Sequence, residues 1–153
     1  MTASQSFDST FILCELAGTT YAIRSQAVRQ MEMVEQITPV PNAPDFVEGV
    51  VFSRGQVVPA ISLRRRFGFE PRPHDLKSRL IVISHANRIV GLLVDGAREF
   101  ISISEEQQQE PPEALAAMSG RYLQAIARVN ERLILILDLE AVLNFSASLD
   151  EAV

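Results

Sequence analysis

The amino-acid sequence predicts an all-β fold built from two small barrels packed side by side. Short apolar runs of strand length, separated by turn-forming residues, follow one another along nearly the whole chain. One pattern in the first half, a strand followed by a polar-Leu step and a helical turn, returns in the second half. Many short strands in two copies of one pattern favour paired barrels. With 153 residues, 47% of them hydrophobic, the chain can bury the core that this fold needs.

The first half of the chain predicts two early strands and a central hairpin. The apolar run at 10–16 predicts the first strand, and a Gly18-Thr19 turn leads into a second strand at 21–23. Three prolines then indicate an extended connector over 37–44. Residues 47–63 predict a β-hairpin, because Val-rich runs favour strands and the glycine between them adopts positive φ without steric cost.

The second half predicts further strands and a short helix near the C-terminus. The predicted strands are 79–84, 88–94, 97–103, 122–129 and 132–137, and short helices are expected at 64–67, 112–118 and 138–144. Asp138 is expected to cap the last of these helices. The proline-containing connector at 69–77 marks the predicted boundary between the barrels.

Composition and charge exclude several classes of function. A net charge of -5 disfavours nucleic acid as a partner, because phosphate binding requires a basic surface. The single cysteine, Cys14, cannot form an internal disulfide, and its apolar surroundings predict a buried thiol. No apolar run approaches the roughly 20 residues of a membrane span, and residues 1–10 lack the features of a secretory signal. We therefore expect a cytoplasmic protein without direct membrane insertion.

The residue types that carry catalysis form no recognisable constellation. His74 lies in the proline-containing connector and His85 in a turn, and neither has a Cys, His or carboxylate at ligand spacing. The sequence therefore predicts no enzyme, no metal site and no cofactor. The basic run at 64–66 has two interpretations, an anchor for an acidic partner or the solvated face of a short helix.

Arg54 is the strongest candidate for a binding residue. The hairpin places its guanidinium above an apolar surface, and Gly49 and Gly55 leave bare backbone that another chain can approach closely. Val28, Val47, Val51 and Val57 can contribute to an apolar rim. A guanidinium within such a rim is a common hot-spot arrangement and suits a helix that lies in a groove. The alternative is a solvated turn tip.

These segments resemble the CheW family, the adaptor proteins that couple chemoreceptors to the histidine kinase CheA in bacterial chemotaxis. The motifs that carry the resemblance are Gly49-Val50, Arg54-Gly55, Val57-Val58-Pro59, Ile61-x-Leu63, Val90 to Gly96 and Leu133 to Leu137. The resemblance implies a single CheW-like domain over 10–150, with two five-stranded SH3-like barrels around a shared core. The expected barrels span 19–77 and 79–144, and residues 10–17 can add a strand to the second.

The resemblance also implies a non-enzymatic adaptor without a cofactor. A groove containing the positions of Val28, Gly49, Arg54, Gly55 and Val57 would grip the cytoplasmic coiled-coil tip of a chemoreceptor. Other surfaces would dock the SH3-like regulatory domain of CheA, at residues that the sequence does not identify. Two alternatives stay open: a sensory domain that binds a small molecule between the barrels, and a free regulatory module of a CheA-like kinase.

Three positions depart from the family pattern, and they cluster around the expected groove. Gln30 stands where the family usually has a glutamate, Phe52-Ser53 where it has Asn-Leu, and Ser62 where it has an aspartate. Gln30 can still accept a hydrogen bond from Arg54, but without the charge assistance of a carboxylate. We therefore hypothesise that the chain serves a divergent receptor or signalling system rather than a standard flagellar one.

Overall fold

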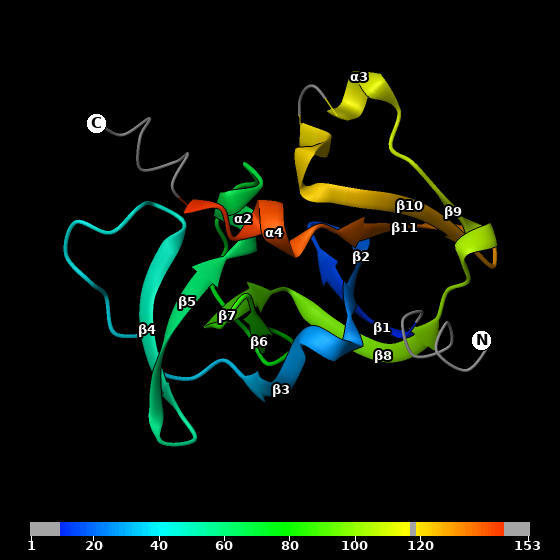
Figure 1. Ribbon diagram of the computed structural model, residues 1–153. Helices are drawn as coiled ribbons and strands as arrows, with labels where there is room; N and C mark the ends of the chain where they lie inside the picture. The colour runs from blue at the N-terminus through cyan, green and yellow to red at the C-terminus, as the bar shows by residue number, and fades with distance from the viewer. Residues whose placement is uncertain (1–9, 117–118, 146–153) are drawn as a thin grey trace.

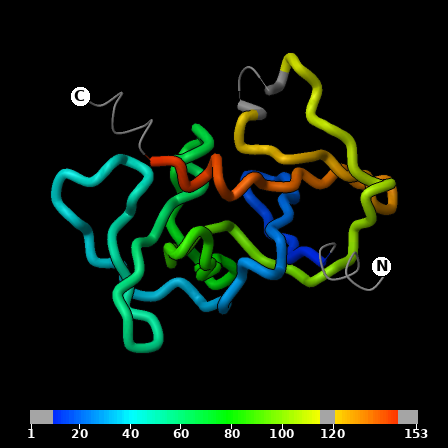
Figure 2. Tube along the Cα trace, in the orientation of Figure 1, coloured from blue at the N-terminus to red at the C-terminus, as the bar shows by residue number. Residues whose placement is uncertain are grey.

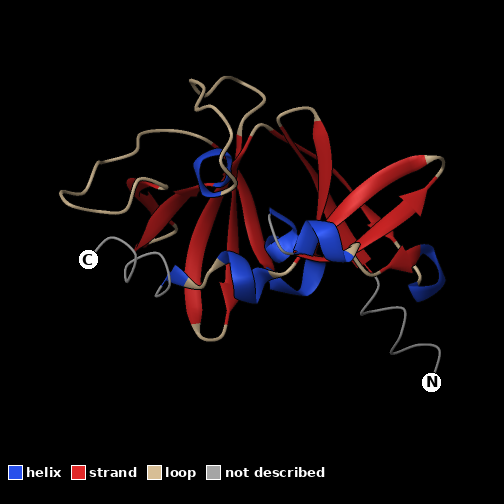
Figure 3. Cartoon of the chain, turned by 90° about the horizontal axis from the view of Figure 1, so that it is seen from above, coloured by secondary structure: helices blue, strands red, loops and turns tan. Residues whose placement is uncertain are grey.

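The computed structural model describes residues 10–116 and 119–145, in which eleven strands form two sheets side by side (Figure 1). The strands are β1 (Thr10–Leu16), β2 (Thr19–Arg24), β3 (Val28–Met33), β4 (Val47–Ser53), β5 (Gln56–Ser62), β6 (Arg79–His85), β7 (Arg88–Val94), β8 (Gly96–Ser102), β9 (Gln108–Gln109), β10 (Leu123–Val129) and β11 (Arg132–Leu137). The helical segments are η1 (Ser25–Ala27), α2 (Leu63–Arg66), η2 (Glu105–Gln107), α3 (Glu113–Ala116), η3 (Ser119–Tyr122) and α4 (Leu139–Val142). Figure 3 shows short helices where the two groups of strands meet.

Each sheet combines strands from both halves of the sequence. The strand order is β8-β1-β2-β11-β10-β9 in the larger sheet and β3-β6-β7-β5-β4 in the smaller one. Most neighbouring strands are antiparallel, but β11 pairs with β2 and β5 pairs with β7 in parallel. Figure 2 shows the result, with the N-terminal chain in blue lying beside the C-terminal chain in orange.

The strands are therefore divided differently from the barrel boundaries expected from the sequence. Residues 79–94, expected in the second barrel, form β6 and β7 of the smaller sheet beside β3, β4 and β5. Residues 19–24, expected in the first barrel, form β2 of the larger sheet, next to β1. The physical cause is the pair of parallel contacts, which join distant segments and leave no mark in local sequence patterns.

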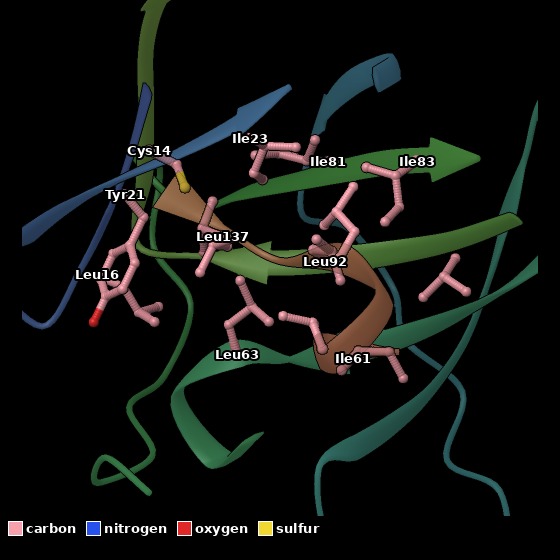
Figure 4. Close-up of a cluster of buried hydrophobic side chains, with 14 of the residues drawn as sticks. Cys14, Leu16, Tyr21, Ile23, Ile61, Leu63, Ile81, Ile83, Leu92 and Leu137 are labelled. Carbon is pink, nitrogen blue, oxygen red and sulfur yellow. The ribbon is translucent and has the colours of Figure 1, made fainter. Parts of the chain in front are cut away.

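The core has three parts, and the largest lies between the sheets (Figure 4). Side chains from both sheets meet there, among them Cys14, Leu16, Tyr21, Ile23, Ile61, Leu63, Ile81, Ile83, Leu92 and Leu137. A second cluster fills the larger sheet with Phe11, Leu13, Ala22, Ile103, Ala125, Ala127, Ile134 and Ile136. A third, formed by Ala60, Leu80, Val82 and Leu93, fills the smaller sheet. Successive residues of the central strands therefore enter different clusters, and both faces of these strands are buried.

The Cys14 thiol belongs to the central cluster, as predicted. Burial, with smaller contributions from the carboxylates of Asp95 and Glu15, raises the pKa of Cys14 to about 12. The thiolate is therefore scarce at neutral pH, and Cys14 acts as a small apolar side chain.

The basic run at 64–66 is largely built into the fold, which neither interpretation from the sequence foresaw. Arg66 is buried, and its Nε donates to the Val142 carbonyl at 2.9 Å. Its guanidinium also donates to the Asn144 carbonyl at 3.1 Å and lies 4.6 Å from the centre of the Phe46 ring. Because these carbonyls belong to the last turn of α4 and the residues after it, Arg66 caps that helix and ties it to α2.

The start of α4 carries the predicted cap. The Asp138 carboxylate accepts a hydrogen bond of 3.3 Å from the backbone N–H of Ala141.

α3 covers part of the helix predicted at 112–118, of which residues 117–118 lie outside the described residues.

Asp95 joins the β1–β2 turn to α2. Its carboxylate accepts a hydrogen bond of 2.8 Å from the backbone N–H of Ala17, and pairs with the Arg64 guanidinium through two contacts of 2.7 and 2.8 Å. Burial would raise the pKa of Asp95, but the hydrogen bonds from Arg64 and Ala17 outweigh it. These contacts hold the pKa of Asp95 below its ordinary value of 3.8.

Acid is therefore expected to weaken the fold through Asp95. A carboxyl group with a depressed pKa stabilises the folded state fully above its unfolded pKa, here 3.8, and loses this contribution as the pH falls through the folded value. Asp95→Asn should lower the melting temperature clearly at about pH 7 and much less below about pH 3. Thermal unfolding monitored by circular dichroism measures the melting temperature at each pH. An equal decrease at the two pH values would contradict the stabilising role of the Asp95 carboxylate.

Candidate functional site

The β4–β5 hairpin carries predicted binding residues at its turn. β4 and β5 pair antiparallel, with Phe52 opposite Val57. The turn residues Arg54 (φ 48°) and Gly55 (φ 84°) both have positive φ, the geometry that two-residue hairpin turns favour. Glycine adopts this conformation freely, whereas for arginine it costs roughly 1 kcal/mol. The predicted hairpin with its turn at Arg54-Gly55 is confirmed.

The tip of this hairpin extends beyond the core and exposes two apolar side chains. Ile61 and Val57 share one face of β5, but Ile61 is buried in the central cluster while Val57 is 65% exposed. Phe52, opposite Val57, is 74% exposed. Figure 1 shows this tip projecting past β3. We call Phe52, Arg54, Gly55 and Val57 the tip patch.

A groove of about 630 Å³ opens beside the tip patch, between β4 and the segment that contains the end of β3. Phe52 and Val57 line it, as do Leu80 and Leu93 from the third core cluster. Its other lining residues are Glu32, Met33, Val34, Glu35, Gln36, Thr38, Val50 and Val51. We call it the seam groove, because it lies between β3 and β4, the two edge strands of the smaller sheet.

Two sets of contacts join β4 to β3 and to the segment that follows β3. The backbone groups of Thr38 and Val50 exchange hydrogen bonds of 2.9 and 2.8 Å. From β3, the Gln30 side chain donates to Ser53 Oγ and to the Glu32 carboxylate, and Ser53 Oγ donates to the same carboxylate. The smaller sheet thereby closes on itself, partly through side chains.

Arg54 makes no hydrogen bond or ion pair with any other residue that the structure describes, and its side chain is exposed. Gln30 accepts no hydrogen bond from Arg54, and its amide nitrogen donates to Ser53 and Glu32. The guanidinium is therefore available to a partner.

The other two predicted site residues lie away from the tip patch. Gly49 is buried within β4, and a Cβ built there would lie 2.1 Å from the Thr38 carbonyl oxygen. The close approach that this glycine permits is therefore made by the chain's own backbone. Val28 is half-buried at the start of β3 and packs against the central cluster. Of the five predicted residues, the structure brings together Arg54, Gly55 and Val57.

Phe52 is the member of the tip patch that sequence reasoning did not identify as a site residue. The signal was present, because a two-residue turn at Arg54-Gly55 places residues 52 and 57 directly opposite each other on one face. An exposed valine at 57 therefore predicts an exposed side chain at 52.

The two histidines each contact one carboxylate. His74 Nε2 lies 3.0 Å from Glu48, and His85 Nε2 lies 2.8 Å from Glu140. Within residues 10–116 and 119–145, no group of three or more His, Cys, Asp or Glu side chains could hold a metal ion. In the same ranges, no helix has the length and apolar character to cross a membrane.

The fold thus combines two β-sheets over a shared core with an apolar patch around an exposed arginine at one hairpin tip. A family model for the CheW-like domain matches residues 10–147, and the chain belongs to this family. The family resemblance noted in the sequence is thereby confirmed, as is the predicted all-β fold with two SH3-like barrels.

The chain is also similar to individual CheW proteins over nearly its whole length. The chemotaxis protein CheW of Klebsiella aerogenes is 30% identical over 142 residues, which cover 93% of this chain and 86% of that protein. The chemotaxis protein CheW of Bacillus subtilis is 30% identical over 148 residues, covering 97% and 95%. The crystal structure of the scaffolding protein TtCheW from Thermoanaerobacter tengcongensis superposes with a TM-score of 0.81 at 28% identity, covering 90% of this chain and 93% of that one.

Proposed function

We propose that this chain is an adaptor that couples a chemoreceptor to a CheA-type histidine kinase, and that the tip patch makes the receptor contact. The adaptor role is supported by membership of the CheW-like family, by relatives named chemotaxis proteins and by similarity to a scaffolding protein. The proposal that the tip patch contacts the receptor is supported by the exposure of Phe52 and Val57 on either side of Arg54. The chain acts by binding rather than by catalysis.

The tip patch suits the surface of a coiled coil. Phe52 and Val57 lose contact with water on docking, while the Arg54 guanidinium forms directional hydrogen bonds and its stem packs against apolar atoms. The seam groove beside the patch can receive an apolar side chain, because Leu80 and Leu93 line it. We propose that the receptor's cytoplasmic coiled-coil tip lies across the patch, and that the kinase's SH3-like regulatory domain docks on another surface.

Arg54→Ala is expected to weaken receptor binding by about 1–3 kcal/mol, the range of interface hot spots, and to leave thermal stability unchanged. Calorimetric titration with a chemoreceptor cytoplasmic fragment encoded in the same genome measures the affinity. Arg128→Ala is a matched control, since Arg128 is an exposed arginine on the larger sheet. Wild-type affinity for Arg54→Ala would rule out this site.

The apolar part of the patch supplies a second variant for the same experiment. Val57 and Leu133 are both 65% exposed, but Leu133 lies on β11 of the larger sheet. Val57→Ser should weaken receptor binding, whereas Leu133→Ser should not. If Leu133→Ser weakens binding and Val57→Ser does not, the receptor contact lies on the larger sheet instead.

A further inference from the structure

Glu32 is a half-buried carboxylate whose hydrogen-bonding partners are neutral. Its Oε2 accepts from the Gln30 side-chain amide and from Ser53 Oγ. Gln30 also donates to Ser53 Oγ, which is 4% exposed, so the three side chains form a closed network across the seam. Both donors that reach this oxygen are uncharged.

This network lies next to Arg54 in the chain and bears on whether Arg54 has a carboxylate partner within the protein. Arg54 follows Ser53 directly, so the Glu32 carboxylate contacts the residue next to it, and yet Arg54 and Glu32 form no ion pair. The donors of Gln30 and Ser53 both contact Oε2 of Glu32, the oxygen on the side of β4. Among the described residues, Arg54 therefore keeps a guanidinium without an internal carboxylate partner, on a turn whose two residues both have positive φ.

We propose that Arg54 is kept free for a carboxylate of the docking partner, so that the partner segment carries an Asp or Glu next to an apolar side chain. The inference rests on the proposed function and specifies the chemistry of the receptor segment. A guanidinium offers a planar fork of N–H donors that matches a carboxylate at two points. The exposed Phe52 and Val57 exclude water from the pair on docking, which strengthens it.

The charges around the patch also fix the orientation of this partner. The seam groove is lined by Glu35 in addition to Glu32, whereas the cation, Arg54, lies at the turn. An acidic residue over the groove would be repelled, so the partner's carboxylate meets the turn and its apolar side chain enters the groove.

Gln30→Glu tests this inference. A second carboxylate beside Glu32 removes the amide donor and repels Glu32, so the guanidinium of Arg54, the residue after Ser53, is expected to be drawn into the network. Binding of the receptor fragment should weaken roughly tenfold, and its dependence on salt concentration should become shallower. Gln124→Glu, which adds the same charge at an exposed position on β10, is the control and should change little.

The outcomes separate this inference from the proposed function. One outcome is that Gln30→Glu binds as the wild type does while Arg54→Ala binds weakly. In that case the inference that Arg54 is kept free for a carboxylate fails, and the receptor site stands. If Arg54→Ala and Val57→Ser both bind as the wild type does, the receptor site itself fails.

A second measurement leaves Gln30 and its network intact. Each Asp and Glu of the receptor fragment is changed in turn to Asn or Gln, and binding is measured to the wild type and to Arg54→Ala. One of these changes should weaken binding to the wild type roughly tenfold and leave binding to Arg54→Ala unaffected. Equal effects of every change in both backgrounds would overturn the inference.

Discussion

Gly49→Ala is expected to destabilise the protein by about 3 kcal/mol, and to lower its melting temperature by roughly 6–12 °C in a chain of this size. The new Cβ would lie 2.1 Å from the Thr38 carbonyl oxygen and 2.6 Å from its carbon, and the φ of Gly49 is 154°. Thr38 cannot simply withdraw, because its backbone exchanges two hydrogen bonds with Val50. The substitution must therefore break the closure of the seam or displace β4.

Thermal and denaturant unfolding of Gly49→Ala measure this loss, and Gly96→Ala is the matched control. At Gly96 a Cβ would meet its nearest neighbour, the Lys77 carbonyl oxygen, at an ordinary 3.8 Å. Gly96→Ala should therefore change stability by well under 1 kcal/mol. Equal stability of the two variants would show that the Thr38 contact does not constrain position 49.

Arg66→Met is expected to cost about 3 kcal/mol of stability, because it leaves the carbonyls at the end of α4 without their charged donor. Methionine keeps much of the apolar stem, so the loss reports on the guanidinium and its contacts with aromatic rings, among them Phe46 at 4.6 Å. Burial lowers the pKa of Arg66 but leaves it charged at neutral pH.

The neighbouring Arg65 provides the control for Arg66→Met. Arg65 pairs with Asp45 at 3.0 Å, but the Asp45 side chain is 81% exposed, and such surface pairs contribute little. Arg65→Ala should therefore cost under about 1 kcal/mol in the same unfolding experiment. A loss as large as that of Arg66→Met would mean that the whole basic run, rather than one buried guanidinium, holds α4.

Local sequence patterns predicted the strands well but could not predict how they are shared between the sheets. Apolar runs bounded by turn residues identified β1, the β4–β5 hairpin and the β10–β11 hairpin, because these depend on neighbours in the chain. The parallel contacts β2–β11 and β5–β7 depend on segments far apart in sequence. Periodicity within a strand specifies which face is buried, but not which strand lies beside it.

The candidate site was predictable to the extent that it depends on one hairpin. Arg54, Gly55 and Val57 follow from the turn, whereas the roles of Gly49 and Gln30 depend on Thr38 and Ser53, which reach them from other strands or loops. Arg66 shows the same limit, since nothing in a run of three arginines indicates which one points inward. Contacts between residues distant in sequence are the ones that the sequence did not predict.

The parallel pairing of β2 with β11 has a consequence for how the protein is made. β2 is complete at Arg24, but the strand beside it ends at Leu137, so a ribosome must add more than a hundred residues before the two can meet. Until then β2 of the nascent β1–β2 hairpin has an unpaired edge, which can pair with the wrong strand. Completion of the larger sheet is a late event in biosynthesis, and the nascent chain is most vulnerable to aggregation before it.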